Sequence, residues 1–306
     1  MVFYRKLPEK ITGRYVMETN ELLKRVRKIE IKTRGLSQHI FAGEYHSAFK
    51  GRGMAFSEVR EYQYGDDFRS VDWNVTARFN HPYIKIFEEE RELTVMLLVD
   101  VSGSGEFGTQ TRYKNSLITE IAAVLSFSAI QNNDKVGVIL FSDRIERFIP
   151  PKKGRQHILK IIRELIDFKP ASRRTNLTIP LRYLVNVIKK RSIAFLITDF
   201  MDENFEDALK IANKKHDLVG LWIYDIRETD LPPVGMMKIR DAETGELAWI
   251  DTGSTFVRNT YREMYQKKKE ELNEMLVKQG VDYTTIAAHE DYVRPLMRLF
   301  QKRMKR

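Results

Sequence analysis

Along residues 93–305 the apolar residues follow two patterns that alternate. Short, mostly apolar runs with little or no charge, typical of buried strands, are separated by longer stretches in which apolar residues recur at helical spacing. The strands are expected at 93–99, 135–142, 192–198, 218–224 and 281–287, and the helices at 113–129, 155–167, 179–190, 204–215, 256–279 and 292–305. Strands that alternate with helices are typical of a doubly wound sheet, so we expect an α/β fold with a mostly parallel sheet flanked by helices.

Two segments depart from this alternation. A short strand at 145–149 follows the strand at 135–142 after a tight turn. Strands joined by so short a turn are antiparallel, so the short strand is expected at an edge of the sheet. Residues 231–252 predict an inserted hairpin whose turn lies near 243–245.

The chain before residue 93 has a different pattern. A helix is expected from Thr19, because Leu22, Val26 and Ile29 recur at helical spacing. Residues 35–92 are rich in glycine and aromatic residues, which favours loops and short strands. We therefore expect two parts. They are an N-terminal helix and β/loop-rich extension (1–92) packed on the main domain, and the main domain itself (93–306), which carries the hairpin near 231–252.

One part of the extension is dense in charged and aromatic residues. They are Arg60, Asp66, Asp67, Arg69, Asp72, Trp73 and Arg78. Arginine forks and stacking aromatics could bind phosphate or nucleic acid. Because the acids nearly match the bases in number, we favour an ion-pair network in which Trp73 pins loops onto the main domain.

Composition narrows the classes of protein and of site. The chain has 52 Lys and Arg against 42 Asp and Glu, a net charge of +10, which permits acidic partners, nucleic acid or anionic membranes without choosing among them. The absence of cysteine excludes disulfides, thiolate metal sites and cysteine nucleophiles. No signal peptide and no run long enough for a membrane span is visible, so a cytoplasmic protein is expected.

Oxygen-bearing side chains follow two of the predicted strands. Asp100 ends the first strand, and Ser102 and Ser104 follow at alternate positions. Asp199 ends the strand at 192–198, and Thr175 lies in a loop before a helix. If the two strands are adjacent and parallel, both carboxylates face one crevice at their carboxyl ends. Carboxylate and hydroxyl oxygens suit Mg²⁺, with Mn²⁺ or Ca²⁺ as alternatives, and disfavour Zn²⁺.

The same stretch also spells a nucleotide motif. Residues 103–108 fit G-x-G-x-x-G after a strand. However, Asp100 would place a negative charge beside a pyrophosphate, and the next helix is expected only near Arg112. The acid at the end of the second predicted strand, Asp143, lies beyond the spacing expected for a ribose contact, and the nearer Asp134 precedes that strand. We therefore favour the metal site, and the absence of G-x-x-x-x-G-K-[ST] excludes a P-loop ATPase.

These motifs resemble a known family. The D-x-S-x-S triplet, the threonine of TNL and the aspartate of ITDF resemble the metal-ion-dependent adhesion site of von Willebrand factor A-like domains. GEYHSAFKGRG, VREYQYGDDFRSVDW, KIFEEER, DKVGVILFSD, PPKKGR and LPPVG extend the match to the bacterial family called domain of unknown function 58, over about residues 43–252. The resemblance implies that Asp100, Ser102, Ser104, Thr175 and Asp199 hold the metal, with Asp199 acting through water. The chain departs from the family at Gly105, where methionine is usual.

The resemblance also implies a function. In such domains the metal binds an Asp or Glu of a partner protein, and the family's genes typically lie beside MoxR-type AAA+ ATPases. We therefore expect a non-enzymatic, metal-dependent adaptor or co-chaperone. A metal-assisted hydrolase is a weaker alternative, because the histidines (39, 46, 81, 157, 216 and 289) show no metal-ligand spacing and no other catalytic constellation is visible. A nucleic-acid binder that uses the basic surface is the other alternative.

Overall fold

The computed structural model describes residues 2–3, 24, 26–30, 33, 45, 48, 54–89, 92–106, 113–241 and 244–305. Its centre is a six-stranded sheet in the order β11-β8-β7-β4-β5-β6. The strands are β4 (Thr94–Asp100), β5 (Lys135–Phe141), β6 (Ile145–Lys152), β7 (Ile193–Thr198), β8 (Asp217–Tyr224) and β11 (Asp282–Ala287). All neighbours pair in parallel except β6, which runs antiparallel to β5 at one edge. The predicted fold class and the predicted edge strand are thus confirmed.

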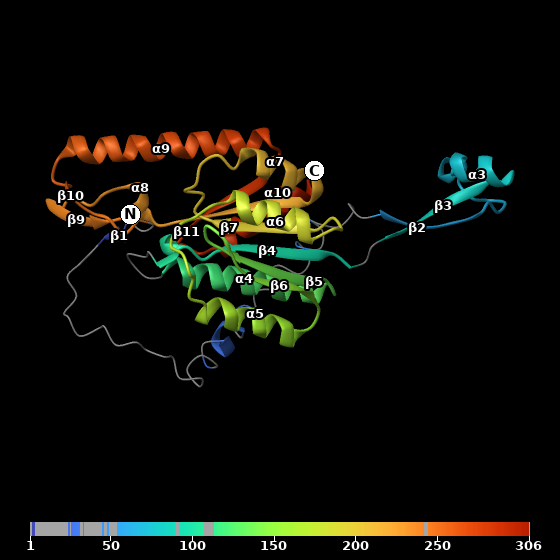
Figure 1. Ribbon diagram of the computed structural model, residues 1–306, viewed down its shortest axis with the longest axis horizontal. Coiled ribbons are helices and arrows are strands. Elements are labelled where there is room, and N and C mark those ends of the chain that lie inside the picture. Colours follow the sequence, from blue (N-terminus) through green and yellow to red (C-terminus); the bar gives the residue numbers. More distant parts are fainter. Residues whose placement is uncertain are drawn as a thin grey trace.

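Helices cover both faces of this sheet (Figure 1). One face is packed by α4 (Lys114–Gln131), α5 (Arg155–Asp167) and α10 (Val293–Met304), and the other by α6 (Thr178–Val187), α7 (Glu206–Lys215) and α9 (Thr255–Lys278). The central strand β4 is buried on both sides, which explains why its sequence is a continuous apolar run without alternation. Within the described residues, no helix is long and apolar enough to cross a membrane.

The predicted hairpin insertion is present. Its strands β9 (Met236–Arg240) and β10 (Leu247–Asp251) are antiparallel, and β1 (Val2–Phe3) adds a third strand beside β9. A short helix, α8 (Ile226–Thr229), connects β8 to this hairpin. The hairpin therefore begins at the carboxyl end of β8, the end of the sheet at which the predicted metal ligands lie.

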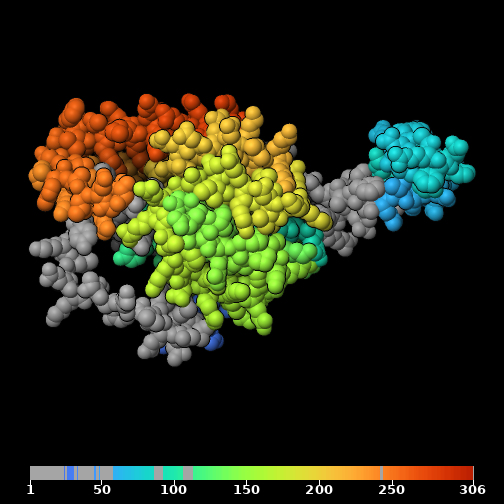
Figure 2. Space-filling view, viewed as in Figure 1, coloured from blue at the N-terminus to red at the C-terminus, as the bar shows by residue number. Residues whose placement is uncertain are grey.

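Residues 54–89 form a small unit of their own, which stands apart from the six-stranded sheet (Figure 1, Figure 2). The strands β2 (Met54–Glu61) and β3 (Tyr83–Glu89) pair as an antiparallel hairpin. Their connection contains the 3-10 helix η2 (Phe68–Ser70) and the short helix α3 (Trp73–Phe79). The short strands expected in this region are present as β2 and β3, but a helix in this segment was not predicted.

Some of the charged residues of this unit form ion pairs, namely Arg60 with Asp66 and Lys85 with Asp72. Arg60 makes two hydrogen bonds to Asp66, at 2.8 and 2.7 Å, and the Asp72 side chain caps α3. The predicted ion pairing is therefore present, but the expected role of Trp73 is wrong. Its side chain is 61% exposed, and its ring packs edge-on against Phe68 of the same unit because both rings project from one connection.

Parts of the N-terminal region contribute to the core of the main domain. Helical residues at 26–30 place Val26 against α4 and α5, as the predicted N-terminal helix requires. Thr19 and Leu22, where that helix was expected to begin, lie outside the described residues. Tyr45 is fully buried against Phe300 of α10. The division into parts at 92/93 stays a prediction.

Candidate metal centre

The two predicted carboxylates lie at the ends of neighbouring strands. Asp100 is the last residue of β4 and Asp199 follows β7, and the two strands pair in parallel through Val99 and Ile197. Both aspartates are buried. The chain leaves β4 through α4 on one face of the sheet and leaves β7 through α7 on the other, so this is a switch point of the doubly wound fold.

Both oxygens of Asp100 accept hydrogen bonds. The backbone N–H of Ser102 donates to Oδ1 at 2.9 Å, and the Thr198 hydroxyl donates to Oδ2 at 2.7 Å. These bonds fix the orientation of the carboxylate. Each carboxylate oxygen can accept a second bond, so Asp100 keeps the capacity to bind a cation.

The two serines connect Asp100 to Asp199. The hydroxyls of Ser102 and Ser104 lie 3.1 Å apart, and Ser104 makes a hydrogen bond with Asp199. The 3-10 helix η3 (Gly103–Glu106) turns the chain at this point and brings the alternate serines to one side. Four of the five predicted ligands are thus linked by contacts.

The fifth, Thr175, lies in a loop that is fixed to the site at two places. The Gly103 N–H donates to the carbonyl of Arg173 at 2.9 Å, and the Asn176 N–H donates to the carbonyl of Ser142 at 3.1 Å. The Thr175 Oγ1 atom is buried and has no hydrogen-bond partner. A buried hydroxyl without a partner is unfavourable, so the Thr175 hydroxyl has the capacity to bind a cation.

A buried lysine that the sequence reading missed completes the surroundings. Lys114, the first residue of α4, is 1% exposed, and its ammonium lies 3.0 Å from Asp199 Oδ2 and 2.6 Å from Glu228 Oε1. The sequence held two signals of this pair. A cation at a helix N-terminus opposes the helix dipole, and D-I-R-E at 225–228 spells a capping box that places Glu228 on α8.

The pKa values reflect these neighbours. Burial, followed by the nearby charge of Asp199, raises the pKa of Asp100 to about 6. Burial also acts to raise the pKa of Asp199, but the ammonium of Lys114 outweighs it and holds that pKa below its ordinary value. The pKa of Lys114 is raised despite its burial, because Asp199 and Glu228 stabilise the charged form.

The donor set fits a hard divalent cation. The residues offer carboxylate and hydroxyl oxygens, the ligand types that Mg²⁺, Mn²⁺ and Ca²⁺ prefer. In the described part of the chain, no three His, Cys, Asp or Glu side chains form a metal cluster, so any metal here relies on hydroxyls. The unpartnered Thr175 hydroxyl and the closeness of two acidic groups agree with this fit.

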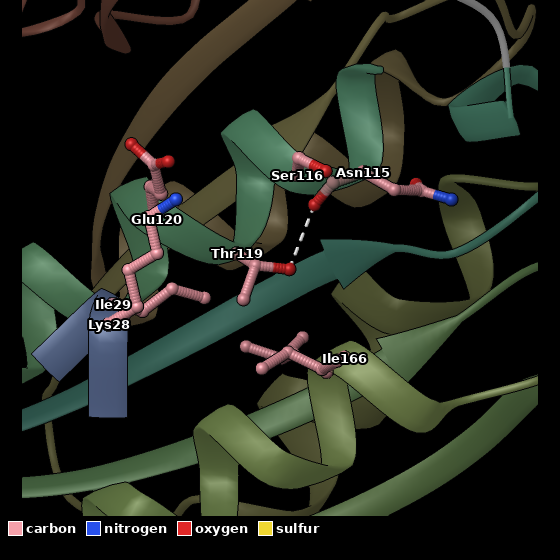
Figure 3. A pocket seen from close by; sticks show the side chains of 8 residues that line it. Lys28, Ile29, Asn115, Ser116, Thr119, Glu120 and Ile166 are labelled. Carbon is pink, nitrogen blue, oxygen red and sulfur yellow. Dashed lines mark hydrogen bonds between the residues drawn. The ribbon is translucent and has the colours of Figure 1, made fainter. Parts of the chain in front are cut away.

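Asn115 explains the glycine at position 105. A Cβ atom on Gly105 would lie 2.1 Å from Asn115 Oδ1, so the amide occupies the space of a side chain. Asn115 also lines a cavity of about 360 Å³ between α4, α5 and the N-terminal helical residues (Figure 3). Within it, the Thr119 hydroxyl donates to the Asn115 carbonyl. Asn115 therefore leaves no room for a larger side chain at position 105 unless it moves.

The chain is similar to several bacterial proteins. It is 30% identical over 223 residues to the uncharacterized protein Mb1516 of Mycobacterium bovis, covering 72% of this chain and 70% of that protein. It is 28% identical over 109 residues to the uncharacterized protein YeaD of Bacillus subtilis, covering 36% of this chain and 25% of YeaD.

Solved structures are similar at low sequence identity. The conserved hypothetical protein BatB of Bacteroides thetaiotaomicron matches with a TM-score of 0.48 and 15% identity, covering 70% of this chain and all (100%) of BatB. The VWA domain of SpRpn10 matches with a TM-score of 0.36 and 11% identity, covering 69% and 95%. The family model described as "Protein of unknown function DUF58" matches residues 58–271. The chain therefore belongs to the DUF58 family.

Proposed function

We propose that the protein binds a divalent cation, most favourably Mg²⁺, and uses it to hold an acidic side chain of a partner protein. The unpartnered Thr175 hydroxyl, in a loop that is hydrogen-bonded to Gly103, supports this proposal together with the buried carboxylate of Asp100 and the Ser102–Ser104 pair. Asp100, Ser102, Ser104 and Thr175 would bind the ion, and Asp199 would act through water. A hard cation with so few charged ligands favours one more anionic ligand, so partner binding depends on the metal.

The resemblance to the family supplies a candidate partner. A MoxR-type AAA+ ATPase is the proposed partner, and the chain would act as its adaptor or co-chaperone. The acidic group required by the metal would come from that ATPase. The net charge of +10 favours the approach of an acidic surface.

Two observations weigh against the alternatives. His157 contacts the carbonyl of Val136 near the start of β5, and His216 directly precedes β8, so both lie at the opposite end of the sheet from Asp100. Neither is placed to act as the general base of a hydrolase. The Arg60 guanidinium, a candidate phosphate ligand, is bound bidentately by Asp66.

A metal-binding measurement tests the first step. We expect Mn²⁺, followed by electron paramagnetic resonance, to bind the wild-type chain at one site. Asp100→Ala should weaken Mn²⁺ binding by at least about 10-fold. Replacing a residue that only supports a metal ligand already lowers metal affinity by about 10- to 100-fold, and Asp100 is proposed as a ligand itself. Asp207→Ala, which removes an exposed carboxylate from the first turn of α7, is the matched control. Equal affinity of Asp100→Ala and wild type would exclude this site.

A binding measurement with a purified MoxR-type ATPase tests the second step. We expect the complex to form in Mg²⁺, to dissociate in EDTA, and to be lost in Asp100→Ala while Asp207→Ala binds normally. A complex that is equally tight with EDTA would show that the metal does not hold the partner.

A further inference from the structure

The charge pair formed by Lys114 and Glu228 is unusual for its depth. Both side chains are at least nine-tenths buried, and the ammonium lies between two carboxylates, Asp199 and Glu228. Burying charged groups costs desolvation free energy even when they are paired. The packing of α4 alone therefore does not explain this arrangement. Its position is informative, because Asp199 is one of the predicted metal ligands.

Glu228 is itself held firmly. The Asp225 N–H donates to Glu228 Oε2 at 2.9 Å, which leaves Oε1 for Lys114. The Tyr261 hydroxyl of α9 donates to the Glu228 carbonyl at 3.0 Å. Glu228 therefore holds the Lys114 ammonium in place from α8. Lys114 cannot move away from Asp199 without also losing its ion pair with Glu228.

The two carboxylate oxygens of Asp199 have different hydrogen-bond partners. Oδ2 accepts from the Lys114 ammonium at 3.0 Å, and Oδ1 accepts from the Met201 N–H at 3.2 Å. A fixed positive charge on one oxygen reduces the negative charge that Asp199 offers to a nearby cation. It also repels that cation directly, while Glu228 on the far side of the ammonium offsets part of the repulsion.

We infer that Lys114 and Glu228 are a pair of positioning residues that set the metal affinity of the site: Lys114 lowers it and Glu228 limits the effect. The inference rests on the proposed metal site and deepens it. A site with weakened affinity binds its metal best when a partner's carboxylate adds a further ligand. The linkage between the two binding events is reciprocal, so the pair makes metal occupancy respond to the partner.

The test is a series of variants whose Mn²⁺ affinities change in opposite directions. Lys114→Met/Glu228→Gln removes both charges, and we expect it to bind Mn²⁺ about five- to tenfold more tightly than wild type. Glu228→Gln alone leaves the ammonium uncompensated, and we expect it to bind more weakly by a similar factor. Lys135→Met, on an exposed lysine at the start of β5, should leave the affinity unchanged.

A purely structural role predicts a different result. If the pair only supports the fold, both variants should weaken Mn²⁺ binding or leave it unchanged, and thermal unfolding should show a parallel loss. Replacing both members of a buried ion pair is often neutral for stability, so the double variant is expected to fold. Equal or weaker Mn²⁺ binding by a folded double variant would overturn the inference.

The metal proposal fails in a way that can be told apart. If Asp100→Ala binds Mn²⁺ as well as wild type does, the site itself is wrong. If Asp100→Ala loses the ion but the double variant and Glu228→Gln do not move in opposite directions, only the role of the pair is wrong.

Discussion

At the scale of one residue, the Thr175 hydroxyl is expected to have different effects on folding stability and on metal binding. It is buried without a partner, so it adds a desolvation cost to folding and returns no hydrogen bond. The Thr198 hydroxyl is different, because it donates to Asp100 and supports the fold. Natural proteins keep such unfavourable groups mainly where they serve a function.

We therefore predict that Thr175→Val leaves the free energy of unfolding unchanged or slightly higher, yet weakens Mn²⁺ binding by about tenfold or more. Urea unfolding and Mn²⁺ titration measure the two effects. The control is Thr119→Val, because the Thr119 hydroxyl donates to the Asn115 carbonyl at 2.8 Å. That variant should lose about 1 kcal/mol of stability and keep its metal affinity. A stability loss without an affinity loss in Thr175→Val would contradict the prediction.

Residues of the site differ in how far the sequence could predict them. Asp100, Ser102 and Ser104 are close together in the chain and end an obvious strand, so their shared location follows from local pattern. Lys114 and Glu228 are separated by 114 positions and meet only because the tertiary fold brings the start of α4 close to Glu228 of α8. No local sequence pattern links the two residues. Each stands out alone, because Lys114 is a cation at a helix N-terminus, where it is unfavourable, and Glu228 completes a capping box.

At the scale of elements, strong periodicity decided what could be predicted. The bounds of α5 were predicted to the residue, because Ile158, Ile161 and Ile162 mark one face and Gly154 precedes its start. The short helix α3 was missed, since its seven residues give no repeating apolar face and its only signal is the Asp72 cap. Strand neighbours were predicted for only two pairs: β5 and β6 from their tight turn, and β4 and β7 by assuming that the two aspartates meet.

The junction between α7 and β8 contains a histidine that should respond to pH. His216 is fully buried, ends α7 through its N–H bond to Ala212, and shares a 3.0 Å hydrogen bond with the Ser192 hydroxyl. Burial, aided by nearby Lys215 and Arg191, lowers the pKa of His216 to about 4. The unfolded chain, with a pKa near 6.5, therefore binds a proton at pH values where the folded protein does not.

Stability should consequently fall as pH drops from about 6.5 toward 4, because protons favour the unfolded state. We predict that this residue alone removes about 2 kcal/mol between pH 8 and pH 5. His216→Gln can keep the bond to Ser192 and does not titrate in this range. Urea unfolding at both pH values should show a loss in wild type that exceeds the loss in His216→Gln by that amount. Equal losses would show that His216 does not control this range.

At the scale of the whole molecule, residues before β4 contribute to the core in unequal ways. Tyr45 is buried among the residues of α4, α10 and the sheet, and its hydroxyl lies 3.5 Å from Asp134 Oδ2. The other oxygen of Asp134 accepts from the Leu93 N–H at the start of β4. This contact spans 89 positions and one glycine- and aromatic-rich stretch, so no local pattern predicts it. Among the side chains that the structure describes in the unit at 54–89, the ion pairs Arg60–Asp66 and Lys85–Asp72 and the ring contacts Phe68–Trp73 and Phe79–Tyr83 lie within the unit.

These differences predict opposite outcomes for two changes in the same part of the chain. Tyr45→Ala should lower the free energy of unfolding of the main domain by about 3–5 kcal/mol, the usual cost of removing a buried aromatic side chain. Replacing residues 54–89 by a short glycine–serine linker should change it by less than about 1 kcal/mol. The linker can be short, because Met54 and Glu89 are paired across the hairpin and such Cα atoms lie about 5 Å apart. Calorimetric Tm values measure both effects, and a large loss on replacing 54–89 would show that this unit packs on the main domain.

The same deletion, assayed with the MoxR-type ATPase, would show whether its exposed aromatic residues Tyr64, Phe68 and Trp73 contact the partner independently of the metal.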